Sequence, residues 1–453
     1  MTVKDDTMIN PRTAAFNVLL KIEEEGAYSN IALNNAIKEY ELKGIDASFM
    51  SAIVYSVLER QLTLDYILSR YSKLPLKKIE TKTLIILRMG VTQILFMDKV
   101  PESAAVNESV KLAKKKGLQK SSGFINGILR SIVRAEIKYT LPDKEKDYAK
   151  HLSVKYSCPT FLIDLWLESY GEENTLGILQ SLADRPVLTV RVNTLKADKQ
   201  SIINSLEKQN VKVREVPFIE NALYIENTGS IENLDSYKKG EIYVQDASSQ
   251  LCVNVLSPKP NDRVLDICSA PGGKAFSSAM LMQNKGEILA FDMFEHKLRL
   301  INSSSKRLGI NIIKTAIRDG ENDKTALPLG DCVLCDVPCS GLGIIRRKPE
   351  IRYKLDTSLD KLADIQYRIL CNSSQYTATG GVLVYSTCTL NPKENGNNAD
   401  RFLQEHKDSF EPIEIKLPKG IQRGIDEPSN QLTVFPHKGN TDGFFISAFR
   451  KVK

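Results

Sequence analysis

The stretch Asp266-Ile267-Cys268-Ser269-Ala270-Pro271-Gly272-Gly273-Lys274 holds a tight glycine turn directly after an apolar run. A turn of this kind between a strand and a helix lets the backbone approach a ligand closely. On both sides of this turn, from Tyr243 to the end of the chain, predicted strands alternate with predicted helices. This alternation indicates a parallel sheet covered by helices, which is a Rossmann-like α/β domain.

Six apolar runs in this region predict strands. They are Val264–Ile267, Ile288–Phe291, Ile312–Ala316, Asp331–Asp336, Gly381–Ser386 and Phe444–Phe449. In an open parallel sheet, ligands bind beyond the carboxyl ends of the strands. Side chains with useful chemistry follow those ends, at Asp266–Lys274, Asp292, Asp319, Asp336–Gly341 and Cys388. We therefore expect one functional site along this edge of the sheet.

The glycine turn departs from both common phosphate-binding motifs. A P-loop requires glycine where Cys268 stands and serine or threonine where Ala275 stands, and the dinucleotide pattern G-x-G-x-x-G is absent. Aspartates end the successive strands instead, and Asp292 is placed to accept hydrogen bonds from ribose hydroxyls. A row of carboxylates suits a cofactor with cationic and hydroxyl donors, and S-adenosylmethionine meets that description. A plain turn with solvated aspartates stays open as the alternative for any single aspartate.

Two cysteines follow apolar runs in distinctive settings. Cys339 lies in Asp336-Val337-Pro338-Cys339-Ser340-Gly341, and Cys388 lies in Ser386-Thr387-Cys388-Thr389. A thiolate that adds to C6 of a cytosine makes C5 nucleophilic toward a sulfonium methyl group, and a base must then remove the C5 proton so that the thiol can leave. The alternative for each is a small buried hydrophobic side chain, the common fate of a free cysteine. That simpler fate is the one we expect for Cys252, Cys332 and Cys371.

Cysteine spacing argues against a metal site. Cys332 and Cys335 form a C-x-x-C pattern, but they fall in the predicted strand Asp331–Asp336. Residues three apart on a strand point to opposite faces and cannot bind one ion together. There is no second C-x-x-C, and eight cysteines in a chain of this length do not make a disulfide scaffold. We expect no metal and reduced thiols.

The chain of 453 residues is too long for one core and predicts two or three domains. Its composition, 42% hydrophobic and 26% charged, is ordinary for a globular protein. The longest dense apolar stretch, Leu84–Met97, contains polar residues and is shorter than a bilayer requires. The first residues lack the basic and apolar regions of a signal peptide. We expect a cytoplasmic, monomeric protein without a membrane segment.

The basic residues are clustered. The net charge is +7, and the segment from Lys111 to Lys138 alone carries eight basic residues and one acidic residue, Glu136. The basic residues are Lys111, Lys114, Lys115, Lys116, Lys120, Arg130, Arg134 and Lys138. Such clustering points to a polyanionic partner, with a solvated helix face as the alternative.

The part before the α/β domain divides in two. Residues up to about Arg134 predict helices, beginning with Asn10 as an N-cap before Pro11 and ending with an apolar stripe over Phe124–Val133. After a polar linker at Leu141–Asp147, the predicted elements are a strand at Val187–Val192, a helix at Asp198–Gln209, and strands at Val211–Val216 and Leu223–Ile225. The predicted domains are an all-α bundle (1–140), a linker with a small α+β module (141–238) and the α/β domain (239–453).

Several of these segments resemble known motifs. The two cysteine segments resemble the signature motifs of RNA cytosine-5 methyltransferases, and Asp266–Lys274 resembles the cofactor motif of that family. Arg191-Val192-Asn193-Thr194-Leu195-Lys196 is also typical of it, while Phe124-Ile125-Asn126-Gly127-Ile128-Leu129-Arg130 resembles the last helix of NusB. A NusB-like domain joined to this methyltransferase is the layout of the RsmB (Sun/Fmu) family, which modifies bacterial 16S rRNA. The resemblance spans nearly the whole chain.

The resemblance implies roles for individual residues. Cys388 would be the nucleophile, Cys339 would assist release of the product, and Asp336 would hold the cytosine edge near N3 and N4. The S-adenosylmethionine site would be lined by Cys268, Ser269, Ala270, Pro271, Gly272, Gly273, Lys274, Asp292, Asp319 and Asp336. The departures from the family pattern are mild: Ser269 stands where alanine is usual, Ala275 where threonine is common and Lys393 where glutamate is frequent.

The implied reaction is methylation of C5 of a cytosine in 16S rRNA, usually cytosine 967, in free RNA or in an early small-subunit particle. The base must leave its stack to reach Cys388. Arg346, Arg347 and Lys348 follow the Cys339 loop and are candidate phosphate contacts, with a solvated basic loop as the alternative. The competing functions are a tRNA cytosine-5 methyltransferase and a mainly non-catalytic RNA-binding assembly or antitermination factor.

Overall fold

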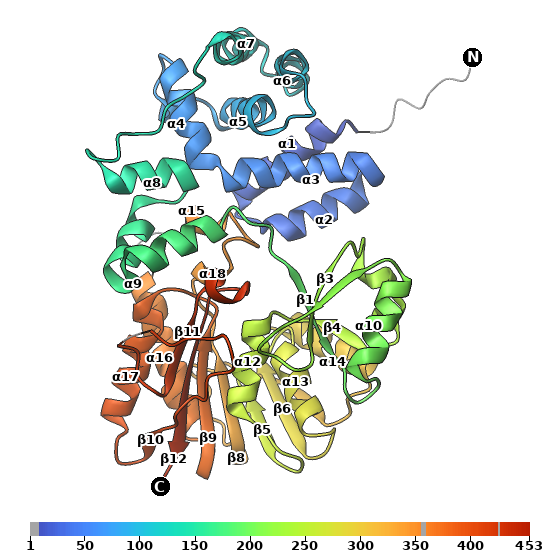
Figure 1. The fold of residues 1–453 in the computed structure, drawn as a ribbon, viewed down its shortest axis with the longest axis vertical. Coiled ribbons are helices and arrows are strands. Elements are labelled where there is room, and N and C mark those ends of the chain that lie inside the picture. Colours follow the sequence, from blue (N-terminus) through green and yellow to red (C-terminus); the bar gives the residue numbers. More distant parts are fainter. Residues whose placement is uncertain (1–8, 355–358, 425) are drawn as a thin grey trace. The chain divides into compact units, whose positions relative to one another are not determined.

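The computed structural model describes residues 9–354, 359–424 and 426–453 (Figure 1). These residues pack into two compact units. One unit takes the chain as far as Asp184 and includes the later segment Ile345–Lys354, and the other begins at Arg185 and holds the remaining described residues. The division into three domains at residues 140 and 238 stays a prediction.

The first unit is helical, as predicted. Its helices are α1 (Pro11–Glu25), α2 (Ser29–Glu39), α3 (Gly44–Glu59), α4 (Gln61–Tyr71), α5 (Thr81–Phe96), α6 (Glu102–Lys115), α7 (Gln119–Arg134), α8 (Tyr148–Tyr156), α9 (Thr160–Ser181) and α15 (Ile351–Lys354). The predicted N-cap is confirmed, because the Asn10 side chain accepts a hydrogen bond from the Arg12 amide. Helices α5 and α7 approach closely at Gly90, where a Cβ atom would lie 2.6 Å from Cδ1 of Leu129.

Helices α8 and α9 were not predicted, and they complete the first unit together with the segment Ile345–Lys354. Arg352 is buried and donates to the carbonyl oxygens of Tyr156 and Ser157, at 3.3 and 3.1 Å. The Glu350 carboxylate accepts a 2.9 Å hydrogen bond from the amide of Ser29. Buried charged side chains with these partners anchor the segment among the helices.

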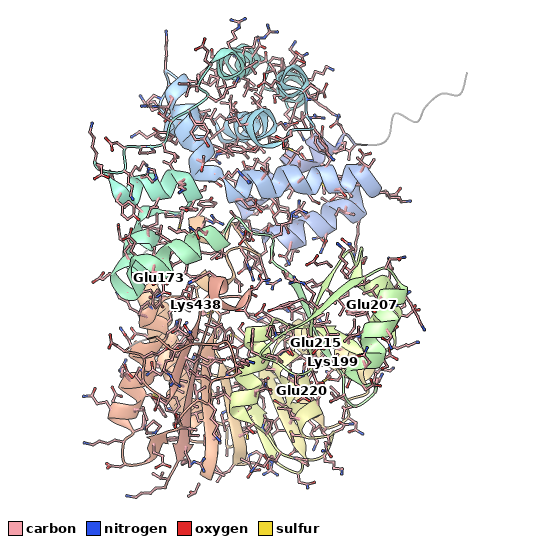
Figure 2. All side chains as sticks on the ribbon, viewed as in Figure 1. Glu173, Lys199, Glu207, Glu215, Glu220 and Lys438 are labelled. Carbon is pink, nitrogen blue, oxygen red and sulfur yellow. The ribbon has the colours of Figure 1, made fainter. Side chains whose placement is uncertain are left out.

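The second unit begins with a four-stranded antiparallel sheet in the order β2-β3-β1-β4. Its elements are β1 (Leu188–Val192), α10 (Lys199–Lys208), β2 (Lys212–Glu215), β3 (Ala222–Glu226), α11 (Asp235–Lys238) and β4 (Ile242–Val244). Three strands and α10 confirm the predictions, and β4 was missed. Ile202 and Leu206 of α10 pack on Val190 and Leu223 of the sheet. Lys199 and Glu215, both labelled in Figure 2, form an ion pair between α10 and β2.

The larger sheet has the order β10-β12-β9-β8-β5-β6-β7, with β11 paired to β12. Its strands are β5 (Arg263–Asp266), β6 (Glu287–Asp292), β7 (Ile313–Ile317), β8 (Gly330–Asp336), β9 (Thr377–Thr387), β10 (Phe410–Pro412), β11 (Gln431–Val434) and β12 (Phe444–Lys451). The strands from β9 to β7 are parallel, and β12 is antiparallel to β9. All six predicted strands and the Rossmann-like class are confirmed.

Helices cover both faces of this sheet. One core contains apolar side chains of α12 (Ala247–Leu256), α13 (Gly273–Leu281) and α14 (Glu295–Leu308), and a second core contains those of α16 (Leu359–Ser374) and α17 (Gly396–Glu405). The chain runs from β5 outward through β6 to β7 and then returns to the other side of β5 as β8. The strand order therefore reverses between β5 and β8, which is where such sheets bind ligands.

No helix among the described residues is both long enough and apolar enough to span a membrane. The described part of the chain also contains no group of three or more histidine, cysteine or acidic side chains placed to hold a metal ion.

Candidate active site

Two neighbouring parallel strands bring the two predicted thiols together. Strands β8 and β9 pair with Asp336 opposite Ser386, and each strand runs into the loop that carries a cysteine. The Sγ atoms of Cys339 and Cys388 lie 3.1 Å apart, and both side chains are only half-buried. A fully buried hydrophobic role does not fit that exposure.

The short distance between the sulfurs affects their protonation. The neighbouring Cys388 sulfur, and then burial, raise the pKa of Cys339 well above its usual value. A thiol that keeps its proton can donate a hydrogen bond, and a hydrogen bond to a charged group favours the charged form. The geometry therefore favours a protonated Cys339 that can donate a hydrogen bond to the neighbouring Cys388 sulfur.

Asp336 is held in place from two sides. The Nζ atom of Lys274 lies 2.5 Å from Oδ2 of Asp336, and the Ser386 hydroxyl donates a 2.8 Å hydrogen bond to Oδ1. Burial acts to lower the pKa of Lys274, but the Asp336 carboxylate raises it above its usual value, so the lysine stays charged. The ammonium group also lies 5.1 Å from the centre of the Phe444 ring. Lys274 thus orients Asp336 from the glycine turn.

A cavity of about 170 Å³ lies where β5 and β8 end. Seven of the predicted cofactor residues line it: Cys268, Ser269, Ala270, Pro271, Gly273, Lys274 and Asp336. The turn needs glycine at Gly272, which has a φ of +101°, and a Cβ atom there would lie 2.5 Å from the Phe276 ring. The structure therefore gathers most of the predicted set around one hollow.

Asp266 also lines this cavity and is the most unusual carboxylate of the site. Its side chain is buried, and neither carboxylate oxygen has a hydrogen-bond partner among the described residues. Burial raises the pKa of Asp266 to about 7, and the nearby Ser269 hydroxyl offsets part of that effect. A buried carboxylate without a partner is costly and is found where a ligand supplies the missing donor or cation. The Asp266 carboxylate can only accept hydrogen bonds when ionised, so it fits a cationic ligand that carries hydroxyl or ammonium groups.

Two of the predicted cofactor residues, Asp292 and Asp319, have carboxylates that interact with residues following them in the chain. Asp292 accepts a 3.1 Å hydrogen bond from the Phe294 amide and lies 3.4 Å from Nζ of Lys297. Asp319 accepts hydrogen bonds from the Asn322 side chain and from following amides, which lower the pKa of Asp319. The 170 Å³ cavity is lined by neither aspartate. Their roles in binding a cofactor stay predictions.

Sequence reasoning missed the contribution of the β4–α12 connection. Val244, Gln245, Asp246 and Ser249 line the same cavity as the glycine turn residues. The one local signal was Asp246, whose carboxylate caps α12 by accepting a 2.9 Å hydrogen bond from the amide of Ser248. A capping aspartate predicts the start of a helix and gives no indication of a ligand.

The remaining cysteines largely follow expectation. Cys252 and Cys332 are buried, as predicted, whereas Cys371, near the C-terminal end of α16, is only half-buried. Cys332 and Cys335 contribute to different cores on opposite faces of the large sheet. The predicted placement of these two side chains on opposite faces of the strand is therefore confirmed.

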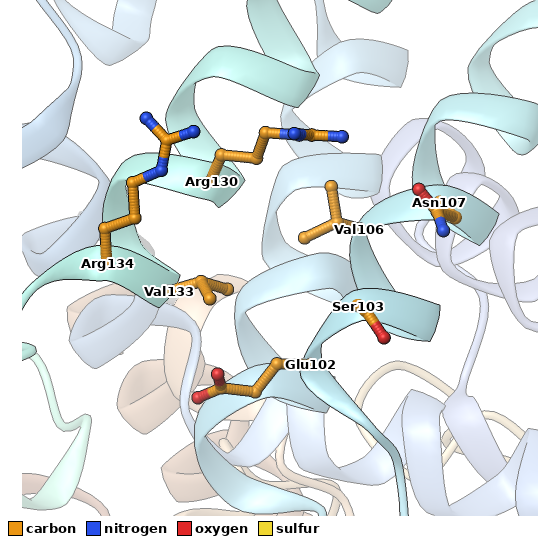
Figure 3. A pocket seen from close by; sticks show the side chains of 7 residues that line it. All are labelled: Glu102, Ser103, Val106, Asn107, Arg130, Val133 and Arg134. Atoms are coloured by element: carbon orange, nitrogen blue, oxygen red, sulfur yellow. The ribbon is translucent and has the colours of Figure 1, made fainter.

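Part of the predicted basic cluster surrounds a hollow of about 520 Å³ in the helical unit. Figure 3 shows Arg130 and Arg134 of α7 on one side and Glu102, Ser103 and Asn107 of α6 on the other. Two members of the cluster are engaged within the unit. Lys116 donates to the Asn17 side chain, and Lys138 lies 3.5 Å from the Glu102 carboxylate. Arg346, predicted as a candidate phosphate contact, is buried.

Three family models match successive parts of the chain. The NusB family matches residues 9–134, a ferredoxin-like domain of RsmF/B-like methyltransferases matches residues 158–232, and the family described as 16S rRNA methyltransferase RsmB/F matches residues 253–450. The α+β module with the sheet β2-β3-β1-β4 thus overlaps the ferredoxin-like match.

Whole-chain relatives agree with these matches. The protein named "Probable ribosomal RNA small subunit methyltransferase B" of Bacillus subtilis is 36% identical over 97% of this chain and 98% of its own length. The crystal structure of PH0851 has a TM-score of 0.83 and 25% identity, covering 98% of this chain and 99% of that one. NSun6 from Pyrococcus horikoshii with SFG has a TM-score of 0.59 and 26% identity, covering 65% of this chain and 98% of that one. With its NusB-like helical domain, its ferredoxin-like module and its Rossmann-like domain, this chain belongs to the RsmB family of 16S rRNA methyltransferases.

Proposed function

We propose that this protein transfers a methyl group from S-adenosylmethionine to C5 of a cytosine in 16S rRNA, with Cys388 as the covalent nucleophile. The observation that carries the proposal is the 3.1 Å separation of the Cys339 and Cys388 sulfurs, directly beyond the strand ends where Asp336 lines a cavity. Two thiols at one strand edge match the chemistry that a cytosine ring needs, because its C5 atom is nucleophilic only after an addition at C6.

The residues around the 170 Å³ cavity fit the cofactor. Bound S-adenosylmethionine supplies an electrophilic methyl group on a positively charged sulfur. Asp266 offers a buried carboxylate whose oxygens accept no hydrogen bond within the described part of the chain, and the glycine turn at Gly272 lets the backbone come close. The relative from Pyrococcus horikoshii was solved with SFG, an analogue of S-adenosylmethionine, which supports the same use here. Asp292 and Asp319 are proposed to complete the site at its ribose end.

The first step belongs to Cys388. Its thiolate adds to C6 of the cytosine, so that a sulfur–carbon bond forms. The electron pair of the C5–C6 double bond shifts onto C5 and is shared through C4 with N3. Asp336, fixed by Lys274 and Ser386, holds the N3 and N4 edge and helps a proton reach N3 as C6 is attacked, so that the developing negative charge is neutralised. The C5 atom, which this addition makes nucleophilic, would then accept the methyl group that bound S-adenosylmethionine would supply, and the bonding pair would stay with the cofactor as a neutral thioether.

Release of the product belongs to Cys339. The neighbouring Cys388 sulfur raises the pKa of Cys339, and this effect ends once the Cys388 sulfur is bonded to carbon. Cys339 can then lose its proton to water and accept the proton from C5. The electron pair of that C–H bond restores the C5–C6 double bond, and Cys388 leaves as a thiolate.

The proposed substrate is a cytosine of 16S rRNA, with cytosine 967 as the family expectation. The base must be flipped or presented in a loop to reach a half-buried sulfur. We propose that the helical bundle and the ferredoxin-like module, at the predicted boundaries of residues 140 and 238, bind the surrounding RNA in the cytoplasm, and that the protein acts as a monomer.

The test is methyl transfer from labelled S-adenosylmethionine to 16S rRNA from a strain that lacks this gene, followed by mapping of 5-methylcytosine. One labelled cytosine that is unmodified in the deletion strain is the expected result. Labelling of tRNA in place of rRNA would favour the tRNA methyltransferase, and no labelling of bacterial RNA would favour a non-catalytic RNA-binding factor.

A further inference from the structure

Glu394 is a buried carboxylate that holds the Cys339 loop. Its side chain has no exposed surface, and its oxygens accept hydrogen bonds from the Ser340 amide at 2.9 Å, the Ser340 hydroxyl at 2.5 Å and the Asn391 side chain at 2.9 Å. The Gln366 amide donates a further 2.8 Å hydrogen bond to Glu394. Four donors on one carboxylate make this a fully satisfied buried network.

The network reaches both neighbours of Cys339. Glu394 holds Ser340, the residue after the cysteine, and the same Gln366 side chain donates a 2.9 Å hydrogen bond to the carbonyl oxygen of Pro338, the residue before it. The loop that carries the sulfur is therefore fixed on each side by side chains from other elements, a 3-10 turn (Pro392–Glu394) and α16.

Asn395, the next residue in the chain, holds the other loop in the same way. Its side-chain oxygen accepts a 2.6 Å hydrogen bond from the Thr387 hydroxyl, and its side-chain NH₂ donates a 2.9 Å hydrogen bond to the Thr389 carbonyl oxygen. Thr387 and Thr389 are the two neighbours of Cys388. The hydroxyls of Thr389 and Ser340 also lie 2.6 Å apart, which joins the two loops directly.

We propose that Glu394 and Asn395 are positioning residues that together set the separation of the two sulfurs, Glu394 through the Cys339 loop and Asn395 through the Cys388 loop. Because they are adjacent in the chain, a single stretch of backbone carries both sets of hydrogen bonds. This inference rests on the proposed function, in which the two sulfurs act in successive steps.

The effects of the two residues can be distinguished by two substitutions that each keep the size and shape of the side chain. Glu394→Gln places an NH₂ donor against the donors of Ser340 and Gln366, and Asn395→Asp places a carboxylate against the carbonyl oxygen of Thr389. Each change keeps the shape of the side chain. Glu394→Gln disturbs two hydrogen bonds that hold the Cys339 loop, and Asn395→Asp disturbs one that holds the Cys388 loop, so each should displace mainly one sulfur. A misplacement of about 1 Å costs on the order of 100-fold in rate.

The expected defects differ. Glu394→Gln should still form the Cys388–RNA adduct but release it on the order of 100-fold more slowly, so that protein–RNA adduct accumulates on a denaturing gel. Asn395→Asp should form the adduct more slowly by a similar factor and accumulate none. Glu394→Asp, which keeps both acceptor oxygens, should recover part of the release rate. Exposed Glu411→Gln and Asn302→Asp are the matched controls and should behave as wild type.

A second measurement needs no RNA. Diamide takes two hydrogens from a pair of neighbouring thiols and leaves a disulfide, and the Cys339–Cys388 pair is followed by peptide mass spectrometry. Both variants should form this disulfide several-fold more slowly than wild type and the controls, while equilibrium binding of S-adenosylmethionine, measured by calorimetry, should stay within about twofold.

The outcomes are distinct. Wild-type rates of release and of disulfide formation in Glu394→Gln would overturn the proposal, and so would proportional loss of adduct formation, release and cofactor binding in both variants. If neither Cys339→Ala nor Cys388→Ala traps RNA, the covalent mechanism is wrong, and the rate of disulfide formation in the two positioning variants still decides whether Glu394 and Asn395 position the sulfurs.

Discussion

The sulfurs of Cys339 and Cys388 lie 3.1 Å apart although the two residues are 49 positions apart in the chain. Their closeness follows from the parallel pairing of β8 and β9, which ends both strands at the same edge of the sheet. It has a chemical consequence, because the Cys388 sulfur raises the pKa of Cys339. One sulfur is thereby kept protonated while the other is free to attack, and that asymmetry makes the two cysteines distinguishable by experiment.

The first prediction concerns the cysteines themselves. Cys388→Ala should reduce methyl transfer below detection, because no other described thiol lies within hydrogen-bonding distance of the Cys339 sulfur. Cys339→Ala should leave the first bond intact and trap protein on RNA, visible as a shifted band after denaturing electrophoresis. Adducts formed by Cys388→Ala but not by Cys339→Ala would mean that the two roles are reversed.

The second prediction uses the sulfur distance without a substrate. Since a disulfide requires the sulfurs to approach from 3.1 Å to about 2.05 Å, mild oxidation with diamide should link Cys339 to Cys388 before any other pair. Methyl transfer activity should fall in proportion to the loss of two free thiols per protein, and it should return after reduction with dithiothreitol. Cys371→Ser, at another half-buried thiol, should leave the course of inactivation unchanged.

The third prediction concerns Asp266 and pH. Its pKa of about 7 lies above the ordinary value of 3.8, so its ionisation costs folding free energy, and the stability it contributes below pH 4 is lost as pH rises to 7. Asp266→Asn cannot ionise. At pH 8 the variant should therefore be more stable than wild type by about 3–4 kcal/mol in urea unfolding, and at pH 4 the two should be nearly equal.

The same substitution should weaken cofactor binding in the same pH range, above the pKa of Asp266, where the wild-type side chain is ionised. The cationic cofactor favours the ionised form of Asp266, so wild-type affinity should rise with pH up to about 7, and a proton should be released on binding. At pH 8, Asp266→Asn should bind S-adenosylmethionine about tenfold more weakly or worse. Calorimetry in two buffers of different ionisation enthalpy measures both quantities. Equal affinities at pH 8 would show that Asp266 does not face the cofactor.

The fold could be predicted largely because parallel strands are buried on both faces and therefore form continuous apolar runs. Strands β10 and β11 escaped prediction because they are short and take their register from β12. Helix α9 was missed for another reason: Gly171 interrupts it with a φ of +73°, so the apolar spacing does not continue through the segment. The N-cap at Asn10 was predictable because the cap, the proline and the stripe are all local.

The site could be predicted where chemistry is carried by a rare residue type, as with Cys339, Cys388 and the glycine turn. Glu394 could not, because its partners Ser340 and Gln366 are 54 and 28 positions away and only the fold brings them together. From the sequence, a glutamate in a polar loop is expected to be exposed to solvent. Its full burial is visible only in three dimensions.

The fourth prediction concerns the Lys274–Asp336 pair. Removing one partner of a buried pair leaves an uncompensated charge, so Lys274→Met should lower the unfolding free energy by about 2–4 kcal/mol. Adding Asp336→Asn should restore part of that loss, because the charge left behind is removed. The double variant should still be inactive, because its neutral amide cannot hold the cytosine edge as the carboxylate does. A double variant no more stable than Lys274→Met would show that the two side chains are energetically independent.

The last prediction concerns the basic hollow in the helical unit. Arg130 and Arg134 lie one helical turn apart on α7 and face the same 520 Å³ hollow (Figure 3). Arg130 also donates a 2.9 Å hydrogen bond to the Asn126 side chain one turn earlier in the helix. If these guanidinium groups contact RNA phosphates, each Arg→Ala change should weaken rRNA binding similarly for all sequences and reduce the slope of log affinity against log salt by about 1. Lys144→Ala, on the exposed 141–147 segment of the same unit, is the control. A slope unchanged in Arg134→Ala, with the fold intact by circular dichroism, would mean that this part of α7 is a solvated face and that the RNA lies elsewhere.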